Sequence, residues 1–250
     1  AARPPALEDL TGCLVSMGWA PSGSFRCSDD VSNWLDDAVR RTVVAYTTFL
    51  PNDPVREWKA WMQDPQNMFW SSAYLFDSQT MYERWQWDIL DAQRPDGSCA
   101  NVTPGAYYDA YNSPWWGGCA VWLPWHWYLC YGDDSLLADS YPAMKRYVDY
   151  LGRAAAKPEA FDGRITEDGL QDWGLADWCP VEETPRAIIN TPAYYLYATI
   201  LARTADLLGK AEEARRYAAV AESIGAAFHR HFLDPASGIY GVPGAAPRNG

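Results

Sequence analysis

The sequence predicts an all-α fold in which helical hairpins form a toroid. Apolar residues recur at helical spacing along most of the 250 residues, and 48% hydrophobic with 21% charged residues is the composition of a globular protein. Long stretches rich in Trp, Asp and Gly, at residues 50–65, 94–117 and 157–183, alternate with short turns near residues 132 and 209. Hairpins whose long loops open at one end gather functional side chains at that end. A superhelical solenoid is the alternative, although the sequence has no constant repeat period.

The first 24 residues are predicted to precede the helical domain. Residues 11–17, TGCLVSM, have the composition of a short strand, and residues 20–24 are rich in Gly, Ser and Pro, as is typical of a connection. We therefore expect residues 1–24 to be the tail of a preceding β-rich domain or a linker.

Six helices in three hairpins are predicted after this segment. Asp29 and Asp30 are N-cap residue types ahead of an apolar stripe that begins at Val31. Pro54 and Pro65 each follow an Asp, a pattern that favours a short helical turn and then a long helix. The helices are expected at about residues 31–49, 65–92, 119–131, 135–152, 185–208 and 211–232.

Residues 51–64, PNDPVREWKAWMQD, concentrate acids, bases and two tryptophans in one stretch. If the part after the proline is helical, Glu57, Trp61 and Asp64 fall at i, i+4 and i+7, so two carboxylates share one face with an indole between them. Like charges and a neighbouring apolar ring both raise the pKa of a carboxylic acid, which can then donate a proton near neutral pH. The segment therefore predicts a general acid. N-capping is the structural alternative for Asp53 and Asp64.

Charge and residue content argue against several classes of partner. A formal net charge of −12 would repel the phosphates of a nucleic acid. The longest apolar run, residues 117–131, is interrupted by Pro124 and His126 and is shorter than the ~20 residues of a membrane helix. The three histidines and six cysteines lack the spacing of a metal site. We therefore expect no nucleic acid, no membrane span, no metal and no cofactor, and instead a neutral or small-molecule partner.

The aromatic content is high, with 14 Trp and 16 Tyr. Indole rings stack on the apolar faces of sugars, and they also fill helical cores. Those inside helical patterns are assigned to the core, namely Trp34, Trp70 and Trp85. Those beside Gly, Pro and polar residues are candidates for a solvated site, namely Trp115, Trp116, Trp173 and Trp178.

Four short motifs follow one another along the chain. They are Gly23-Ser24-Phe25-Arg26-Cys27-Ser28-Asp29; Asp53-Pro54-Val55-Arg56-Glu57 with Trp61 and Asp64; Pro124-Trp125 with Tyr131-Gly132-Asp133; and Ala176-Asp177-Trp178 before Thr184-Pro185. Their order and spacing, over about residues 20–250, resemble the α-L-rhamnosidases of glycoside hydrolase family 78. The resemblance implies an (α/α)6 barrel of six hairpins, of which residues 25–250 would be the first half.

The same resemblance implies a role for each residue that matches a motif. Glu57 would be the general acid that protonates the departing glycosidic oxygen. Trp61 would form a pocket wall. The implied substrate-binding residues are Asp53, Arg56, Trp61, Asp64, Trp116, Asp177 and Trp178.

Three departures from the family pattern affect these expectations. The family often has one more residue between its first Asp and the Arg-Glu pair than Asp53 allows. Where members commonly show Trp-x-Asp-Ala, residues 116–119 are Trp-Gly-Gly-Cys, so one carboxylate is absent. An inverting glycosidase also needs a second carboxylate as base. The family's base lies in the last part of the barrel, and we expect it beyond Gly250, after three of six hairpins. Half a toroid would expose an apolar wall and should aggregate or dimerise.

The function expected from the resemblance is an inverting glycoside hydrolase that releases terminal α-L-rhamnose from small glycosides or polysaccharides. Two alternatives stay open. One is another (α/α)6 glycosidase, of the fucosidase or unsaturated-uronyl hydrolase type. The other is a non-catalytic sugar-binding relic of the fold. Aglycone, linkage, compartment and oligomeric state stay undecided.

Overall fold

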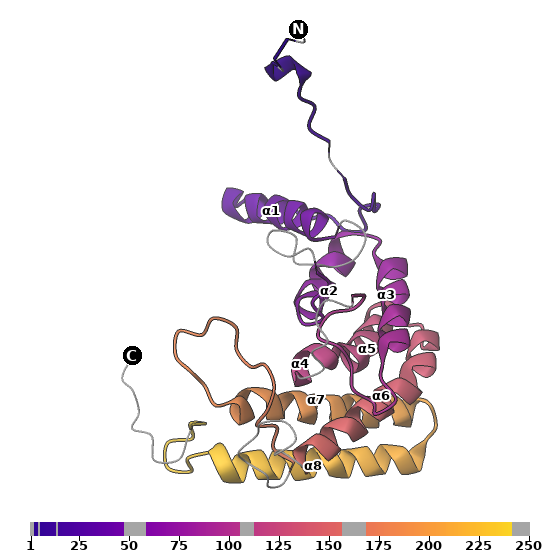
Figure 1. The fold of residues 1–250 in the computed structure, drawn as a ribbon, viewed down its shortest axis with the longest axis vertical. Coiled ribbons are helices and arrows are strands. Elements are labelled where there is room, and N and C mark those ends of the chain that lie inside the picture. The colour runs from indigo at the N-terminus through magenta and orange to yellow at the C-terminus, as the bar shows by residue number, and fades with distance from the viewer. Residues whose placement is uncertain are drawn as a thin grey trace.

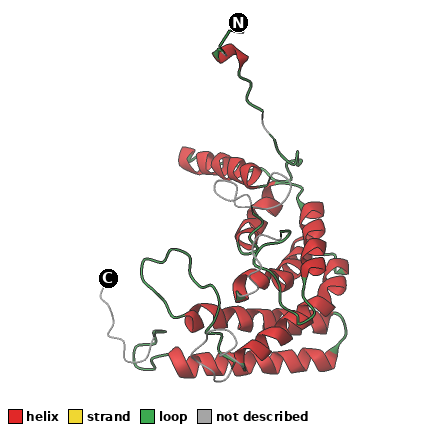
Figure 2. Cartoon of the chain, in the orientation of Figure 1, coloured by secondary structure: helices red, strands yellow, loops and turns green. Residues whose placement is uncertain are grey.

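The computed structural model describes residues 3–4, 6–13, 15–47, 59–105, 113–156 and 169–241. These residues are helical and irregular, with no strand among them (Figure 2). The elements are η1 (Leu7–Asp9), α1 (Asp30–Tyr46), α2 (Asp64–Leu75), α3 (Gln79–Ala92), α4 (Pro114–Gly117), α5 (Cys119–Tyr131), α6 (Ser135–Ala155), α7 (Arg186–Leu207) and α8 (Ala211–Phe232). The predicted helical class is confirmed. Among the described residues, no helix combines the length and apolar content that crossing a bilayer requires.

The helices follow an open arc that runs from α1 to the antiparallel pair α7 and α8 (Figure 1). Helices α5 and α6 form one hairpin, joined by residues 132–134, and α7 and α8 form the next, joined by residues 208–210. The described part of the loop before α7 lies at the opposite end of that helix from the short turn into α8 (Figure 1). The alternation of long and short connections predicted from the sequence is therefore present at this hairpin.

Helix ends follow the local signals in the sequence. The side chain of Asp29 caps α1 by accepting a 2.8 Å hydrogen bond from the backbone N–H of Ser32. Gly132 ends α5 with φ +73°, a left-handed conformation that costs a residue with a Cβ about 1–2 kcal/mol. Gly209 has φ +71° between α7 and α8. These three positions explain why the predicted boundaries of most helices agree with the structure.

The prediction of one long helix at residues 65–92 is wrong, because this region forms two helices, α2 and α3. The chain leaves α2 at Phe76, whose backbone is extended with φ −142° and ψ 155°. There residues 75–77 pair with residues 20–22 through two backbone hydrogen bonds, of 3.1 and 2.8 Å. A continuous helix would lose these bonds. The break therefore depends on a segment more than fifty residues earlier in the chain.

The strand expected at residues 11–17 is not formed. Residues 11–13 and 15–17 are irregular and exposed, and a strand exists only where a neighbour completes its hydrogen bonds. Within the described residues they have no such ladder. The assignment of residues 1–24 to a preceding domain or linker stays a prediction.

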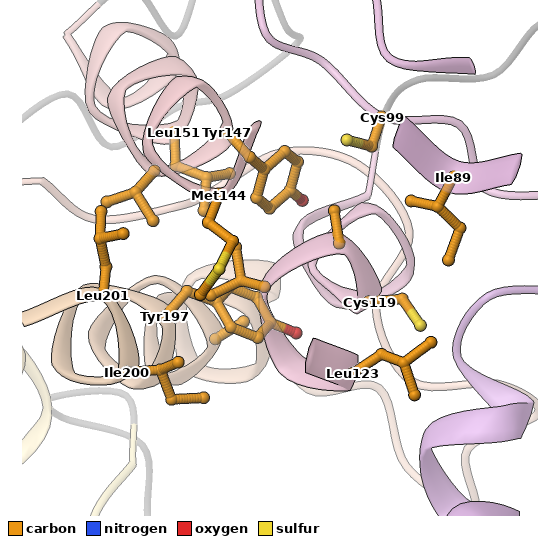
Figure 3. Packing of buried hydrophobic residues seen from close by; sticks show 14 of the residues in the cluster. Ile89, Cys99, Cys119, Leu123, Met144, Tyr147, Leu151, Tyr197, Ile200 and Leu201 are labelled. Carbon is orange, nitrogen blue, oxygen red and sulfur yellow. The ribbon is translucent and has the colours of Figure 1, made fainter. Parts of the chain in front are cut away.

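The main core lies between α3, α5, α6 and α7. Trp85 is fully buried, as predicted, and so are the aromatic rings of Tyr147 and Tyr197, which meet edge to face with centroids 6.2 Å apart. Figure 3 shows these two tyrosines among the aliphatic side chains of α6 and α7. Trp70 packs against this core, whereas Trp34 is 63% exposed on α1. The core assignment of Trp34 is therefore wrong within this chain.

Candidate active site

A cavity of about 630 Å³ opens where the start of α2, helix α4, the loop before α7 and the first turns of α7 meet. Its volume lies in the range of ~300–1,000 Å³ that is typical of small-molecule sites. The lining residues are Trp61, Gln63, Asp64, Asn67, Trp115, Trp116, Leu175, Ala176, Asp177, Trp178 and Ile189. Apolar and aromatic surface thus dominates, with two carboxylates and two amides among it.

Five residues that the sequence nominated for substrate binding line this one cavity, although they come from three separate segments. They are Trp61, Asp64, Trp116, Asp177 and Trp178. The nominated general acid Glu57 and the binding residues Asp53 and Arg56 lie outside the described residues. Their roles therefore stay predictions.

Other lining residues were not nominated as substrate-binding from the sequence. Asn67 lies about one helical turn after Asp64, so the helical period could have found it, whereas Gln63 precedes the helix and had no such signal. Leu175 and Ala176 precede the nominated pair on the same loop. Ile189 had no signal of its own, because an aliphatic residue at the start of a helix predicts only burial.

The first wall of the cavity, residues 60–67, is positioned by regular backbone structure. Residues 60–62 pair with residues 101–103: the N–H of Met62 donates to the carbonyl of Asn101 at 2.9 Å, and a second bond of 3.0 Å follows. Successive side chains in an extended segment point to opposite sides, so the burial of Met62 directs Trp61 toward the cavity. Helix α2 then begins at Asp64, which is its first residue rather than the expected N-cap.

Helix α4 supplies the tryptophan pair Trp115 and Trp116. The indole N–H of Trp115 donates to the carbonyl of Ile189 on α7 at 2.8 Å. The carbonyl of Trp115 accepts 2.9 Å and 3.3 Å bonds from the side chains of Gln66 on α2 and Tyr197 on α7. These bonds connect α4 to both α2 and α7, so this part of the cavity lining is held from two sides.

The packing around Gly117 and Gly118, which follow Trp116, explains why the carboxylate of the family pattern is absent. A Cβ on Gly118 would lie 2.0 Å from ring atoms of Tyr197, and a Cβ on Gly117 would lie 2.7 Å from the hydroxyl oxygen of Tyr147. Both glycines are buried and neither lines the cavity. In this chain the position therefore serves the close packing of α4 on α6 and α7, with no room for an acidic side chain.

The second wall, residues 169–178, comes from the loop before α7. Trp173, expected in a solvated site, is 1% exposed, and its indole N–H donates to the side-chain oxygen of Gln171 at 2.6 Å. Burial behind the loop, edge to face with Tyr150, removes it from the cavity, so that expectation is wrong. Trp178 is 70% exposed and stands at the rim beside Asp177.

The polar groups of the cavity suit an uncharged, hydroxyl-bearing ligand. Asp64 and Asp177 accept hydrogen bonds, while the amides of Gln63 and Asn67 can donate or accept. The described residues contain no group of three or more His, Cys, Asp or Glu side chains placed to hold a metal ion. Indole faces beside hydroxyl-binding carboxylates are the combination that sugar rings require, because a sugar has apolar C–H faces and a polar edge.

Comparison with known proteins adds to this geometry. Residues 20–246 match the family model of the bacterial alpha-L-rhamnosidase 6 hairpin glycosidase domain. An alpha-L-rhamnosidase of Formosa agariphila is 29% identical over 187 residues, which are 70% of this chain and 19% of that relative. The chain thus spans about a fifth of the length of the relative it matches.

Solved structures are similar over most of the chain. The alpha-L-rhamnosidase from Dictyoglumus thermophilum has a TM-score of 0.82 at 27% identity, covering 93% of this chain and 26% of that protein. The Streptomyces avermitilis alpha-L-rhamnosidase, solved as a complex with L-rhamnose, has a TM-score of 0.78 at 26% identity, covering 87% of this chain and 20% of that protein. The toroid prediction is confirmed, and the described helices are a part of such a six-hairpin domain.

Proposed function

Because the chain belongs to the family of the bacterial alpha-L-rhamnosidase 6 hairpin glycosidase domain, we propose that it carries one part of the active site of an inverting α-L-rhamnosidase. The observation that supports the proposal is the convergence of Trp61, Asp64, Trp116 and the pair Asp177 and Trp178 on one cavity. The substrate would be a small-molecule or oligosaccharide glycoside that ends in α-L-rhamnose.

The lining chemistry fits a terminal deoxy sugar. Indole rings such as Trp61 and Trp116 can stack on its C–H faces, and the carboxylates Asp64 and Asp177 can accept hydrogen bonds from its hydroxyls. Rhamnose carries a methyl group where most hexoses carry a hydroxymethyl group. The aliphatic side chains of the cavity would contact that methyl group without leaving a hydroxyl unpaired.

The proposed reaction is a single displacement at the anomeric carbon. Glu57 gives its proton to the glycosidic oxygen as the bond from that oxygen to C1 breaks, so the aglycone leaves as a neutral alcohol. Water forms the new bond to C1 from the opposite face, and its proton passes to a second carboxylate about 6.5–9.5 Å from the acid. We assign no base among the described residues.

The test is a panel of 4-nitrophenyl glycosides offered to the full-length protein. The α-L-rhamnoside should be hydrolysed, and the α-L-fucoside and an unsaturated uronide should not. The first-formed rhamnose, followed by NMR, should be the β anomer, as inversion requires. Preference for another sugar would contradict the proposed substrate, and an α anomer formed first would contradict the inverting mechanism. Rhamnose binding without turnover would indicate a non-catalytic relic of the fold.

A further inference from the structure

Three consecutive residues near the start of α7 contact both α4 and the second wall. The carbonyl of Ile189 accepts the indole N–H of Trp115 at 2.8 Å, which fixes α4. The hydroxyl oxygen of Thr191 accepts the backbone N–H of Gln171 at 3.0 Å, at the start of the second wall. Asn190 lies between them and contacts the part of the loop that reaches the cavity.

Asn190 holds the loop with one amide group. Its Nδ2 donates two hydrogen bonds, to the carbonyl of Trp173 at 2.7 Å and to the carbonyl of Leu175 at 2.9 Å. These carbonyls flank Gly174, whose φ of +79° turns the chain toward the cavity. Leu175 itself lines the cavity, and Asp177 and Trp178 follow within three residues. The amide therefore holds the loop at the turn that leads into the cavity.

The chemistry of the contact requires an amide. Asn190 is fully buried, where an unpaired charge is costly, and both acceptors are main-chain carbonyls. Among uncharged side chains, only the primary amides of Asn and Gln offer two N–H donors on one atom. The Oδ1 of Asn190 has no hydrogen-bond partner within the described residues, so the contacts that hold the loop come from the donors. An aspartate of the same shape would present acceptors to acceptors, and a leucine would leave both carbonyls unpaired.

We propose that Asn190 is a positioning residue of the site: its amide holds the turn at residues 173–175 so that Asp177 and Trp178 stand against the cavity. The effect that we expect on hydrolysis rests on the proposed function. The loop residues would grip the sugar and not transfer protons, so loss of the anchor would act mainly on substrate binding. Misplacing binding groups by about 1 Å can cost about 100-fold in rate.

The kinetic test compares N190D with a matched control in the full-length protein. Thr204 is also a fully buried polar residue of α7, and its hydroxyl has no hydrogen-bond partner in the described part of the chain, so T204V removes a buried polar group away from the loop. N190D should lower kcat/KM for the rhamnoside by about 10-fold to 100-fold, chiefly through KM, and T204V by less than about 2-fold. N190S, which keeps one donor, should fall between N190D and the wild type, and it serves if N190D does not fold.

A second measurement reports the loop without turnover. Cys179 is exposed immediately after Trp178 and accepts a nitroxide spin label once the accessible Cys13, Cys27 and Cys130 are replaced by Ser; Cys99 and Cys119 are buried. The label should become more mobile in N190D and stay unchanged in T204V.

The two measurements together decide the proposal. Greater label mobility with raised KM supports it. Unchanged label mobility, or greater mobility with wild-type kinetics, overturns it. If the wild-type protein hydrolyses no rhamnoside, the proposed function fails by itself, and the label still decides whether Asn190 holds the loop.

Discussion

The two walls of the cavity are held in different ways. The first wall, residues 60–67, follows from backbone pairing with residues 101–103 and from the start of α2. The second wall, residues 169–178, is irregular and is held mainly by the side chains of Gln171, Asn190 and Thr191. Backbone pairing tolerates most substitutions, whereas a side-chain anchor is lost with one residue. The second wall should therefore be the more sensitive to single changes away from the cavity.

The largest effect is expected at Glu57, the general acid of the proposed reaction. Replacement by Gln removes the acidic proton and keeps the shape, so kcat/KM for a substrate with a poor leaving group should fall about 10²-fold to 10⁴-fold. A 4-nitrophenyl substrate, whose leaving group needs less protonation, should lose less. E222Q, an exposed change on α8, is the matched control and should keep wild-type rates. Equal losses on both substrates would remove Glu57 from the role of general acid.

The next effect separates two tryptophans of the second wall, Trp173 and Trp178. W173A removes a buried indole and should lower the free energy of unfolding by about 3–5 kcal/mol. W178A removes an exposed indole at the cavity rim, so it should raise KM and leave the thermal midpoint within a degree or two of the wild type, since exposed substitutions change stability by about 0.5 kcal/mol or less. Thermal unfolding and kinetics on the same preparations check both. A large loss of stability in W178A would show that the rim residue is structural.

A smaller effect is expected at Gly118, which extends the comparison to α4. Its φ of −66° and ψ of −11° suit any residue, so the obstacle to a side chain is packing: the three atoms nearest to a new Cβ, at 2.0–2.3 Å, all belong to Tyr197. G118A should lower the free energy of unfolding by about 1–3 kcal/mol through overpacking. G241A, where a new Cβ meets no atom within 4 Å, is the control. The double variant G118A/Y197L should cost less than the sum of its parts, and strict additivity would reject the clash.

The difference between the walls also explains what the sequence could predict. Helix periods and caps are local, so the helices and the cavity residues Trp61 and Asp64 could be located from short patterns. The break after α2 could not, because it depends on backbone bonds to residues 20–22. The burial of Trp173 could not be predicted either, because its sequence neighbours suggested a solvated loop. The residue that anchors it, Asn190, lies on a different element, α7. Nonlocal contacts decide both cases.

The smallest effect is expected when the carboxylate of each wall is replaced, which compares the two walls directly. Asn in place of Asp keeps one acceptor oxygen but loses the charge, and a hydrogen bond to a charged group contributes roughly 1 kcal/mol more than one to a neutral group, so D64N and D177N should each lower kcat/KM by roughly 10-fold or less. Asp64 is half-buried on a helix end, whereas Asp177 is exposed on the loop. Hydrogen bonds are stronger where water is excluded, so D64N should lose more than D177N. Kinetics with the rhamnoside check the order. A larger loss in D177N would mean that the loop grips the sugar more firmly than α2 does.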